Sequence, residues 1–146
     1  MTVKDFKQIN NLIATSGQPT LDELKDIAEL GYDTIINLSV PGSNLAIPHE
    51  GEIAIKNGMN YVHIPVLWQS PSSEQFKLFR SIMDSLRGKK VWIHCVGNVI
   101  AAYFVYTYLM MSPNLHNVKD AKSIIDMSTV NENWSKFITH NISEVN

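Results

Sequence analysis

The chain's only cysteine lies in the stretch Lys90-Val-Trp-Ile-His-Cys95-Val-Gly-Asn-Val-Ile-Ala101, between an apolar strand and an apolar helix. The β-branched run before Cys95 predicts a strand over 91–94, and the nearly all-apolar segment 98–111 predicts a helix from the middle of a fold. Gly97 permits an unusual backbone turn between the two elements. A thiol at such a turn faces the N–H groups and the positive dipole end of a helix, an environment that lowers a cysteine pKa and binds an oxyanion.

Strand-like and helix-like segments alternate along the rest of the chain. Thr20 and Glu23 form a capping box at the start of one predicted helix, and Ser72 with Gln75 has the same pattern at the start of another. The predicted strands are 11–16, 34–39, 61–66 and 91–94, and the predicted helices are 21–30, 48–57, 72–87 and 98–111, with helical patterns after 118 and around 134–138.

This alternation predicts an α/β fold over residues 1–146, a single three-layer domain in which a largely parallel central sheet of four to five strands is flanked by helices. In such sheets the reactive loops lie beyond the carboxyl ends of the strands. Three loops follow predicted strands in this chain, at 40–48, at 67–71 and at Cys95. We therefore expect the three loops to meet over one pocket.

Composition excludes several classes of function. The net charge is −2 and the isoelectric point about 6.2, so we expect no nucleic-acid partner and no anionic membrane partner. The longest apolar run, 100–111, is too short to span a bilayer. The first ten residues lack an apolar signal-peptide core, and one cysteine excludes an intrachain disulfide, so we expect a cytoplasmic protein.

The histidines show no spacing typical of a metal site, and we predict no metal and no cofactor. The sequence contains no Walker A motif, no Gly-x-Gly-x-x-Gly and no Gly-x-Ser-x-Gly. Four of the five histidines are predicted to be structural or solvated: His49, His63, His116 and His140. The fifth is His94, directly before the cysteine.

The loop resembles the signature of the cysteine-based protein tyrosine and dual-specificity phosphatases: His-Cys, a short loop, then arginine. It is most similar to the compact bacterial branch whose loop reads His-Cys-x-x-Asn-x-Arg-x-Ser. Further segments fall where that branch has similar residues: Ser16-Gly-Gln-Pro19, Ile35-Ile-Asn-Leu38, Ile47-Pro-His-Glu-Gly51, Gly58-Met-Asn-Tyr-Val-His-Ile-Pro-Val66 and Trp134. The resemblance covers nearly the whole chain and implies a protein tyrosine phosphatase-like fold.

The resemblance also implies roles for individual residues. Cys95 matches the thiolate nucleophile that attacks phosphorus, and His94 matches the histidine that orients the loop. The residues that match the phosphate-binding loop are Val96, Gly97, Asn98, Val99, Ile100 and Ala101, and those that match the general-acid loop are Leu67, Trp68 and Gln69. The implied ligand is a phosphorylated molecule or another oxyanion.

Three chemical parts of that family are replaced in this chain. Ile100 stands at the position of the loop arginine, which grips two phosphate oxygens and is needed most in the transition state. Ala102 stands at the position of the hydroxyl that helps the thiolate leave. Leu67 and Gln69 stand where relatives place an Asp or Glu as general acid. The chain's two arginines, Arg80 and Arg87, both lie on the helix before the fourth predicted strand, so we expect weak or absent phosphomonoester hydrolysis.

Three functions remain open at the level of sequence. The first is an impaired phosphatase relative that binds an anionic partner. The second is an active enzyme that uses Cys95 as a nucleophile, either a phosphatase with an unrecognised cation or a rhodanese-like sulfurtransferase, which also places cysteine at a strand-to-helix turn. The third is a structural or interaction module in which Cys95 is only buried, since free cysteine is among the most buried residue types.

Overall fold

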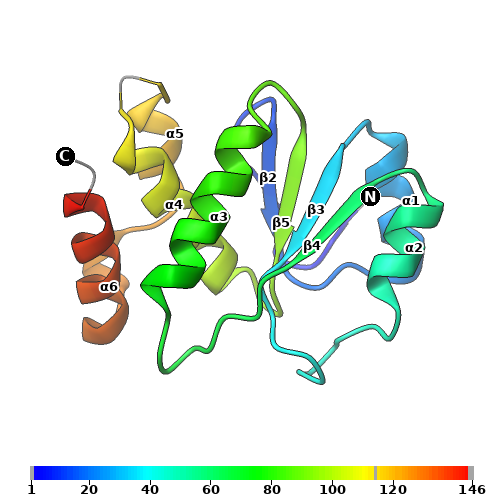
Figure 1. Ribbon diagram of the computed structural model, residues 1–146, viewed down its shortest axis with the longest axis horizontal. Helices are drawn as coiled ribbons and strands as arrows, with labels where there is room; N and C mark the ends of the chain where they lie inside the picture. The colour runs from blue at the N-terminus through cyan, green and yellow to red at the C-terminus, as the bar shows by residue number, and fades with distance from the viewer. Residues whose placement is uncertain (1, 114, 145–146) are drawn as a thin grey trace.

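The computed structural model describes residues 2–113 and 115–144. A five-stranded sheet forms its centre, with the strand order β1-β2-β5-β3-β4 (Figure 1). The strands are β1 (Lys7–Gln8), β2 (Ile13–Ser16), β3 (Thr34–Asn37), β4 (Asn60–His63) and β5 (Val91–His94). Four of them run parallel, and the short β1 pairs antiparallel with β2. The carboxyl ends of the parallel strands therefore share one edge, the lower edge in Figure 1.

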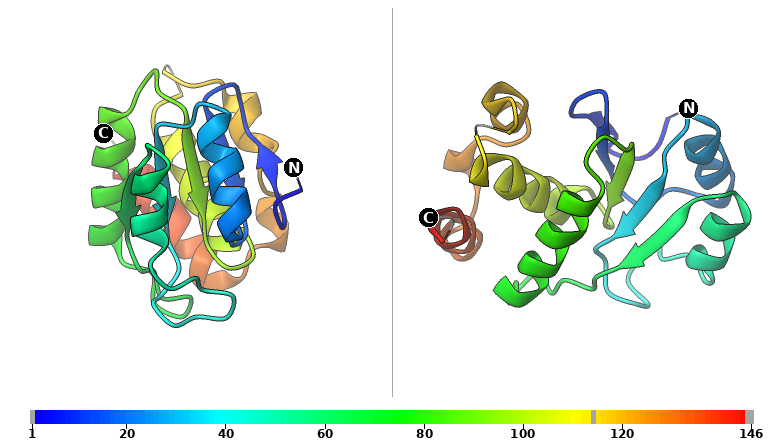
Figure 2. Two further views of the ribbon diagram at one scale, coloured as in Figure 1. Left: turned by 90° about the vertical axis from the view of Figure 1, so that its right-hand side faces the viewer. Right: turned by 45° about the horizontal axis from the view of Figure 1, so that its top comes forward.

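Helices cover both faces of the sheet, as Figures 1 and 2 show. Two helices, α1 (Leu21–Glu29) and α2 (Glu50–Lys56), lie on one face. The helices of the other side are α3 (Ser73–Ser85), α4 (Val99–Met111), α5 (Val118–Lys122) and α6 (Glu132–Ser143), with a 3₁₀ turn at Met127–Thr129. The predicted three-layer α/β architecture is confirmed.

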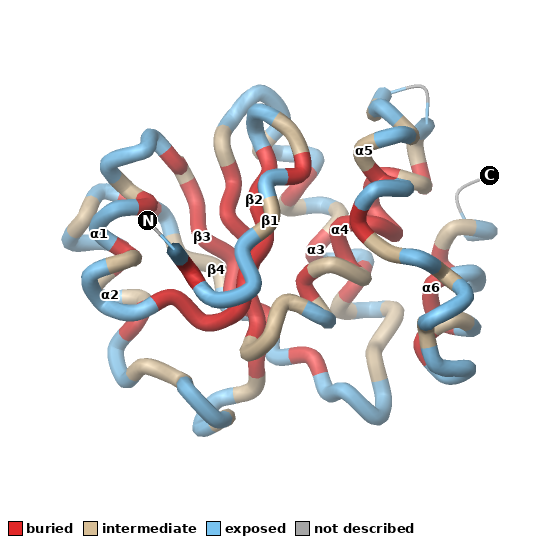
Figure 3. Tube along the Cα trace, turned by 180° about the vertical axis from the view of Figure 1, so that it is seen from behind, coloured by how far each residue is buried: buried red, intermediate tan, exposed pale blue. Residues whose placement is uncertain are grey.

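Alternate residues of the central strands supply two hydrophobic cores, because successive strand side chains point to opposite faces. Ile35 and Trp92 pack with the side chains of α1 and α2. Ile36 and Ile93 pack with those of α3, α4 and α6. The central strands β2, β3 and β5 are buried on both faces, as the red trace in Figure 3 shows, which explains why their sequences do not alternate between apolar and charged residues.

The structure differs from the predicted elements at several boundaries. The strand β1 was not predicted, and β2 begins at Ile13 because the Asn10 side chain accepts the N–H groups of Leu12 and Ile13 in a turn. The strands β3 and β4 end at Asn37 and His63, two and three residues before their predicted ends. The helix predicted from Pro48 begins instead at Glu50, because His49 has a left-handed backbone with φ 63°.

The described helices include none that is both long enough and apolar enough to cross a membrane.

Candidate active site

Cys95 lies directly after the central strand β5, which pairs with β2 on one side and with β3 on the other. The ladders hold the backbone on both sides of the thiol: the Cys95 N–H donates to the Ser16 carbonyl over 3.4 Å, and the His94 carbonyl accepts the Leu38 N–H over 2.8 Å. Cys95 itself is buried, with 3% of its surface exposed. The position of the thiol is thus set by the middle of the sheet.

The loop after Cys95 folds back over the thiol. The backbone N–H groups of Gly97, Asn98, Ile100 and Ala101 lie around the Cys95 sulfur, where they favour the thiolate form and so lower the thiol pKa. Asn98 precedes α4 with φ 68°, in the left-handed region, and this conformation turns the successive N–H groups towards one point. Converging backbone amides of this kind form concave nests that bind anions in other proteins.

Burial raises the pKa of the Cys95 thiol above its ordinary value, although the four loop amides act in the opposite direction. The sequence predicts a lowered pKa, because it reveals the helix N-terminus but not the depth of the thiol. Desolvation disfavours the charged thiolate, and here it outweighs the backbone hydrogen bonds. Free cysteine has a pKa of about 8.5, so the thiol is mainly protonated at neutral pH.

The segment after β2 braces the loop from behind. The Val96 carbonyl accepts the Gln18 N–H over 3.0 Å, and a β-bridge joins Gly17 to Gly97. A Cβ atom at residue 17 would lie 2.6 Å from the Val96 carbonyl oxygen, so only glycine fits there. On the other side of the loop, the side-chain Nδ2 group of Asn98 donates to the Asp5 backbone carbonyl over 2.7 Å.

A buried polar network lies beneath the loop. The His94 Nε2 atom is 2.6 Å from Glu50 Oε2, and the Gln18 Nε2 group donates to Glu50 Oε1 over 2.7 Å. The other ring nitrogen of His94, Nδ1, is 3.3 Å from the Cys95 carbonyl oxygen. His94 is 0% exposed, Glu50 4% and Gln18 6%. The network ties α2 and the segment after β2 to the residue that carries the thiol.

Sequence reasoning missed Glu50 and Gln18 as site residues. Both lie in segments that the family resemblance rests on, Ser16–Pro19 and Ile47–Gly51. A carboxylate that opens a short helix ordinarily faces solvent, so the residue type alone does not indicate burial. One signal in the sequence could have identified them. Both residues lie in segments that resemble the phosphatase family, as does the strand that ends at Cys95, so the three segments could be expected to meet at one site.

The three loops that follow β3, β4 and β5 meet around one cavity of about 430 Å³, as the strand pattern predicts. Its floor includes Cys95 and its walls are mainly apolar. The lining residues are Ser39, Val40, Ser43, Val66, Leu67, Trp68, Cys95, Val96, Gly97, Val99 and Ile100. Cavities of this size hold small-molecule ligands in many proteins.

Only part of the predicted general-acid loop lies at the cavity. Leu67 and Trp68 line the cavity, whereas Gln69 is exposed and does not. The C-terminal helix α6 fixes this loop: Trp134 Nε1 donates to the Trp68 carbonyl over 2.9 Å, and Asn133 Nδ2 donates to the Gln69 carbonyl over 3.2 Å. A carboxylate at residue 67 would therefore face the thiol pocket more directly than one at residue 69.

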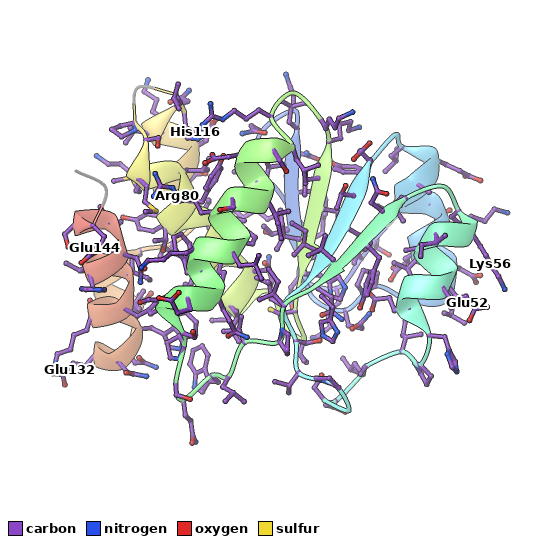
Figure 4. All side chains as sticks on the ribbon, in the orientation of Figure 1. Glu52, Lys56, Arg80, His116, Glu132 and Glu144 are labelled. Carbon is purple, nitrogen blue, oxygen red and sulfur yellow. The ribbon has the colours of Figure 1, made fainter. Side chains whose placement is uncertain are left out.

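No charged side chain belongs to the cavity lining, taken over the described residues. Arg87 pairs with Asp84 over 3.1 Å at the far end of α3. Arg80 lies on α3, beside the helices drawn in yellow in the upper half of Figure 4. The loop after β5, which carries Cys95, lies at the lower edge of the sheet in Figure 1. The fold therefore brings neither arginine to the thiol.

None of the other histidines within the described residues lines the Cys95 cavity, although His49 and His63 line a neighbouring pocket. His63 Nε2 contacts the Ser39 carbonyl over 2.7 Å, and His116 packs against the Tyr108 ring at 5.0 Å between centroids. Across residues 2–113 and 115–144, no group of three or more His, Cys, Asp or Glu side chains is placed to hold a metal ion.

The sequence of the chain is similar to known phosphatase-like domains. Residues 5–103 match the family described as the phosphatase-like domain of beta-lactamase hydrolase-like proteins. Two such proteins from Xylella fastidiosa, strains Temecula1 and 9a5c, are each 33% identical to this chain over 90 residues. The match covers 60% of this chain but only 21% of each relative, so the chain spans about a fifth of their length.

Solved structures resemble the chain over almost its full length. A candidate phosphatase (DUF442) from Shewanella putrefaciens CN-32 superposes with a TM-score of 0.87 at 29% identity, covering 98% of this chain and 94% of that one. Tk-PTP in its active form has a TM-score of 0.72 at 22% identity, covering 97% and 95% of the two chains. PTPMT1 in complex with PI(5)P has a TM-score of 0.79 at 12% identity, covering 97% of each. The last two show likeness of fold.

Proposed function

Because this chain belongs to the family of phosphatase-like domains of beta-lactamase hydrolase-like proteins, with the fold of the cysteine-based protein tyrosine phosphatases, we propose that its Cys95 loop binds a phosphorylated or other oxyanion ligand. We propose further that it hydrolyses phosphomonoesters weakly or not at all. The observation that carries the proposal is the convergence of four backbone N–H groups on the Cys95 sulfur, at the floor of a cavity.

The backbone cradle supports anion binding because it needs no particular side chains. Amides held by the β5–α4 turn face a point above the sulfur, where they stabilise negative charge without reorganising. The Gln18 N–H holds the Val96 carbonyl, and the β-bridge between Gly17 and Gly97 fixes the next residue of the loop. These are backbone contacts, so they survive the loss of the family arginine.

The side chains of the loop argue against fast turnover. Ile100, at the position of the family arginine, packs partly against the hydrophobic core and supplies no charge to a phosphate oxygen. Removing one such electrostatic contact costs about 3–4 kcal/mol of transition-state stabilisation, or two to three orders of magnitude in rate. Ala102 and Leu67 supply neither a hydroxyl nor an acid. The raised pKa of Cys95 further reduces the thiolate available for attack.

Binding and turnover are tested separately. Titration of the labelled chain with phosphate or vanadate, followed by NMR, should shift the amides of Gly97, Asn98, Ile100 and Ala101. No shift at millimolar ligand would overturn the proposed anion site. Hydrolysis of an aryl phosphate should be no faster than that of the Cys95→Ser variant, and a clear excess for the natural chain would instead identify an active cysteine phosphatase.

Gain of function tests whether the scaffold is intact. Ile100→Arg combined with Ala102→Ser and Leu67→Asp should restore measurable, Cys95-dependent hydrolysis of the aryl phosphate. Leu67 is chosen for the acid because it lines the cavity, and Gln69→Asp in the same background is the matched control because residue 69 faces solvent. No gain in a folded triple variant would mean that the loop geometry no longer fits a phosphoryl transition state.

A second candidate function is rhodanese-like sulfur transfer. The observation in its favour is that the loop amides point at the sulfur itself, without a cation or an acid in the cavity lining. In this reaction the Cys95 thiolate attacks the outer sulfur of thiosulfate, sulfite leaves, and cyanide then removes the persulfide sulfur as thiocyanate. Thiocyanate formation by the natural chain but not by Cys95→Ala would support it, and equal rates would exclude it.

A further inference from the structure

We propose that the ligand of the Cys95 cavity is a carboxylate with a medium-length apolar tail, with its carboxylate on the loop amides and its tail between Ile100 and Trp68. This inference rests on the proposed oxyanion site and names the ligand class that the cavity favours. The supporting observation is that one cavity combines backbone N–H groups, which can bind an anion, with walls made of apolar side chains.

The walls of the cavity are made of apolar side chains from three loops. Val99 and Ile100 come from the start of α4, and Leu67 and Trp68 from the loop after β4. Leu67, Trp68 and Val99 are 56%, 43% and 44% exposed, so a large part of their apolar surface lies open around one opening. An exposed apolar patch of this kind is typical of a binding site. An apolar tail would remove this surface from water.

The charge of the site favours a monoanion over a phosphate dianion. No charged side chain lines the cavity within the described part of the chain, and the nearby carboxylate of Asp5 is paired with Lys4 over 3.3 Å, so the surroundings of the loop supply no net positive charge. The cost of moving an ion out of water rises with the square of its charge, so a dianion costs about four times as much as a monoanion of equal size. The four amides and no cation have to offset that cost.

The donors of the site match the acceptors of one carboxylate. Four loop amides lie around the Cys95 sulfur, and a carboxylate has two oxygens with about four acceptor sites. Ser43 also lines the cavity, but its hydroxyl oxygen is buried, so the head group depends on the loop amides. A protonated Cys95 adds no negative charge beneath the ligand, in keeping with the raised pKa of the thiol.

The test compares head groups and tails on the natural chain. The probes are acetate, butyrate, hexanoate, octanoate, octanol, octyl phosphate and inorganic phosphate, titrated against the isotope-labelled protein. We expect octanoate to shift the amides of Gly97, Asn98, Ile100 and Ala101, and the affinity to rise about fourfold for each methylene added from butyrate until the cavity is filled. Phosphate should bind more weakly than octanoate.

Two variants at residue 100 test where the apolar tail lies and which head group the site prefers. Ile100→Ala should weaken octanoate by at least tenfold and leave acetate unchanged, whereas Ile55→Ala, an exposed isoleucine on α2, should change neither. Ile100→Arg should reverse the order of octanoate and phosphate, because it returns a cation to the cavity.

Each other outcome overturns the inference. Tighter binding of phosphate or octyl phosphate than of octanoate would reject the carboxylate while leaving the proposed oxyanion site standing. Octanol binding as tightly as octanoate would show that the tail alone is recognised. Binding by none of the anions would reject the oxyanion site together with the inference.

Discussion

Glu50→Ala should destabilise this protein far more than an ordinary glutamate substitution. The Glu50 carboxylate is buried and accepts two hydrogen bonds, from Gln18 over 2.7 Å and from His94 Nε2 at 2.6 Å. Hydrogen bonds to a charged group contribute about 1.5–3 kcal/mol each, and removing one partner of a buried pair costs about 3–5 kcal/mol. We therefore expect a loss of about 3–5 kcal/mol in the free energy of unfolding.

Glu52→Ala is the matched control on the same helix. Glu52 forms an exposed ion pair with Lys56 over 3.0 Å, and both side chains lie on the outer side of α2 in Figure 4. Exposed pairs of this spacing contribute at most about 0.5 kcal/mol. Both variants are measured by urea unfolding at pH 7, with circular dichroism and tryptophan fluorescence as independent probes.

A second readout separates the site from general stability. The His94 ring joins Glu50 to the Cys95 carbonyl, so losing Glu50 should loosen the loop and speed alkylation of the folded protein by iodoacetamide. Glu50→Gln keeps the shape and one acceptor, and it should lie between the natural protein and Glu50→Ala in both measurements. Equal stability losses for Glu50→Ala and Glu52→Ala, or a loss below about 1 kcal/mol for the former, would refute the reasoning.

Three further predictions concern Gly17 behind the loop, the Cys95 thiol and the Tyr108 side chain on α4. Gly17→Ala should cost about 1–3 kcal/mol and displace the Val96 carbonyl, which its Cβ would meet at 2.6 Å; urea unfolding and phosphate titration check both effects. Alkylation of Cys95 should be slow at pH 7 and rise through pH 9, because its pKa is raised; a plateau below pH 8 would contradict the burial argument. Burial and Asp84 raise the pKa of Tyr108 to about 12, so the native state holds that proton more tightly than the unfolded state, and stability should fall as pH rises above about 10. Tyr108→Phe should remove that part of the alkaline loss in unfolding curves collected between pH 9 and 11.

The apolar pattern of the sequence was sufficient to predict the layers of this fold. The capping box predicted at Thr20 and Glu23 is complete in the structure. At Ser72 only half of the predicted box forms: the Ser72 side chain accepts the Gln75 N–H at the start of α3, whereas the Gln75 side chain donates to the Pro65 carbonyl. Boundaries were less predictable where one backbone conformation decided them. His49 delays α2 to Glu50 through its left-handed φ, which nothing in the residue type required.

The location of the candidate site was predictable for a topological reason. Parallel strands end at one edge, so loops that follow them in the sequence have to meet there. The sequence also showed that the chain lacks an arginine at residue 100 and an acid at residues 67 and 69, because residue identity needs no structure. Of the three residues assigned to the general-acid loop, Leu67 and Trp68 line the cavity and Gln69 does not, and the Gln69 carbonyl accepts the Asn133 side chain of α6.

The sequence by itself therefore determined the α/β layers, the place of Cys95 at a strand-to-helix turn and the side chains missing around it. These follow from local patterns: the period of apolar residues, the turn residues and the order of strands. Only the tertiary structure decided that Glu50 meets His94 from 44 residues away, that Gly17 braces Val96, and that burial raises the pKa of Cys95. Those properties depend on which distant segments exclude water from the same point, and no local pattern carries that information.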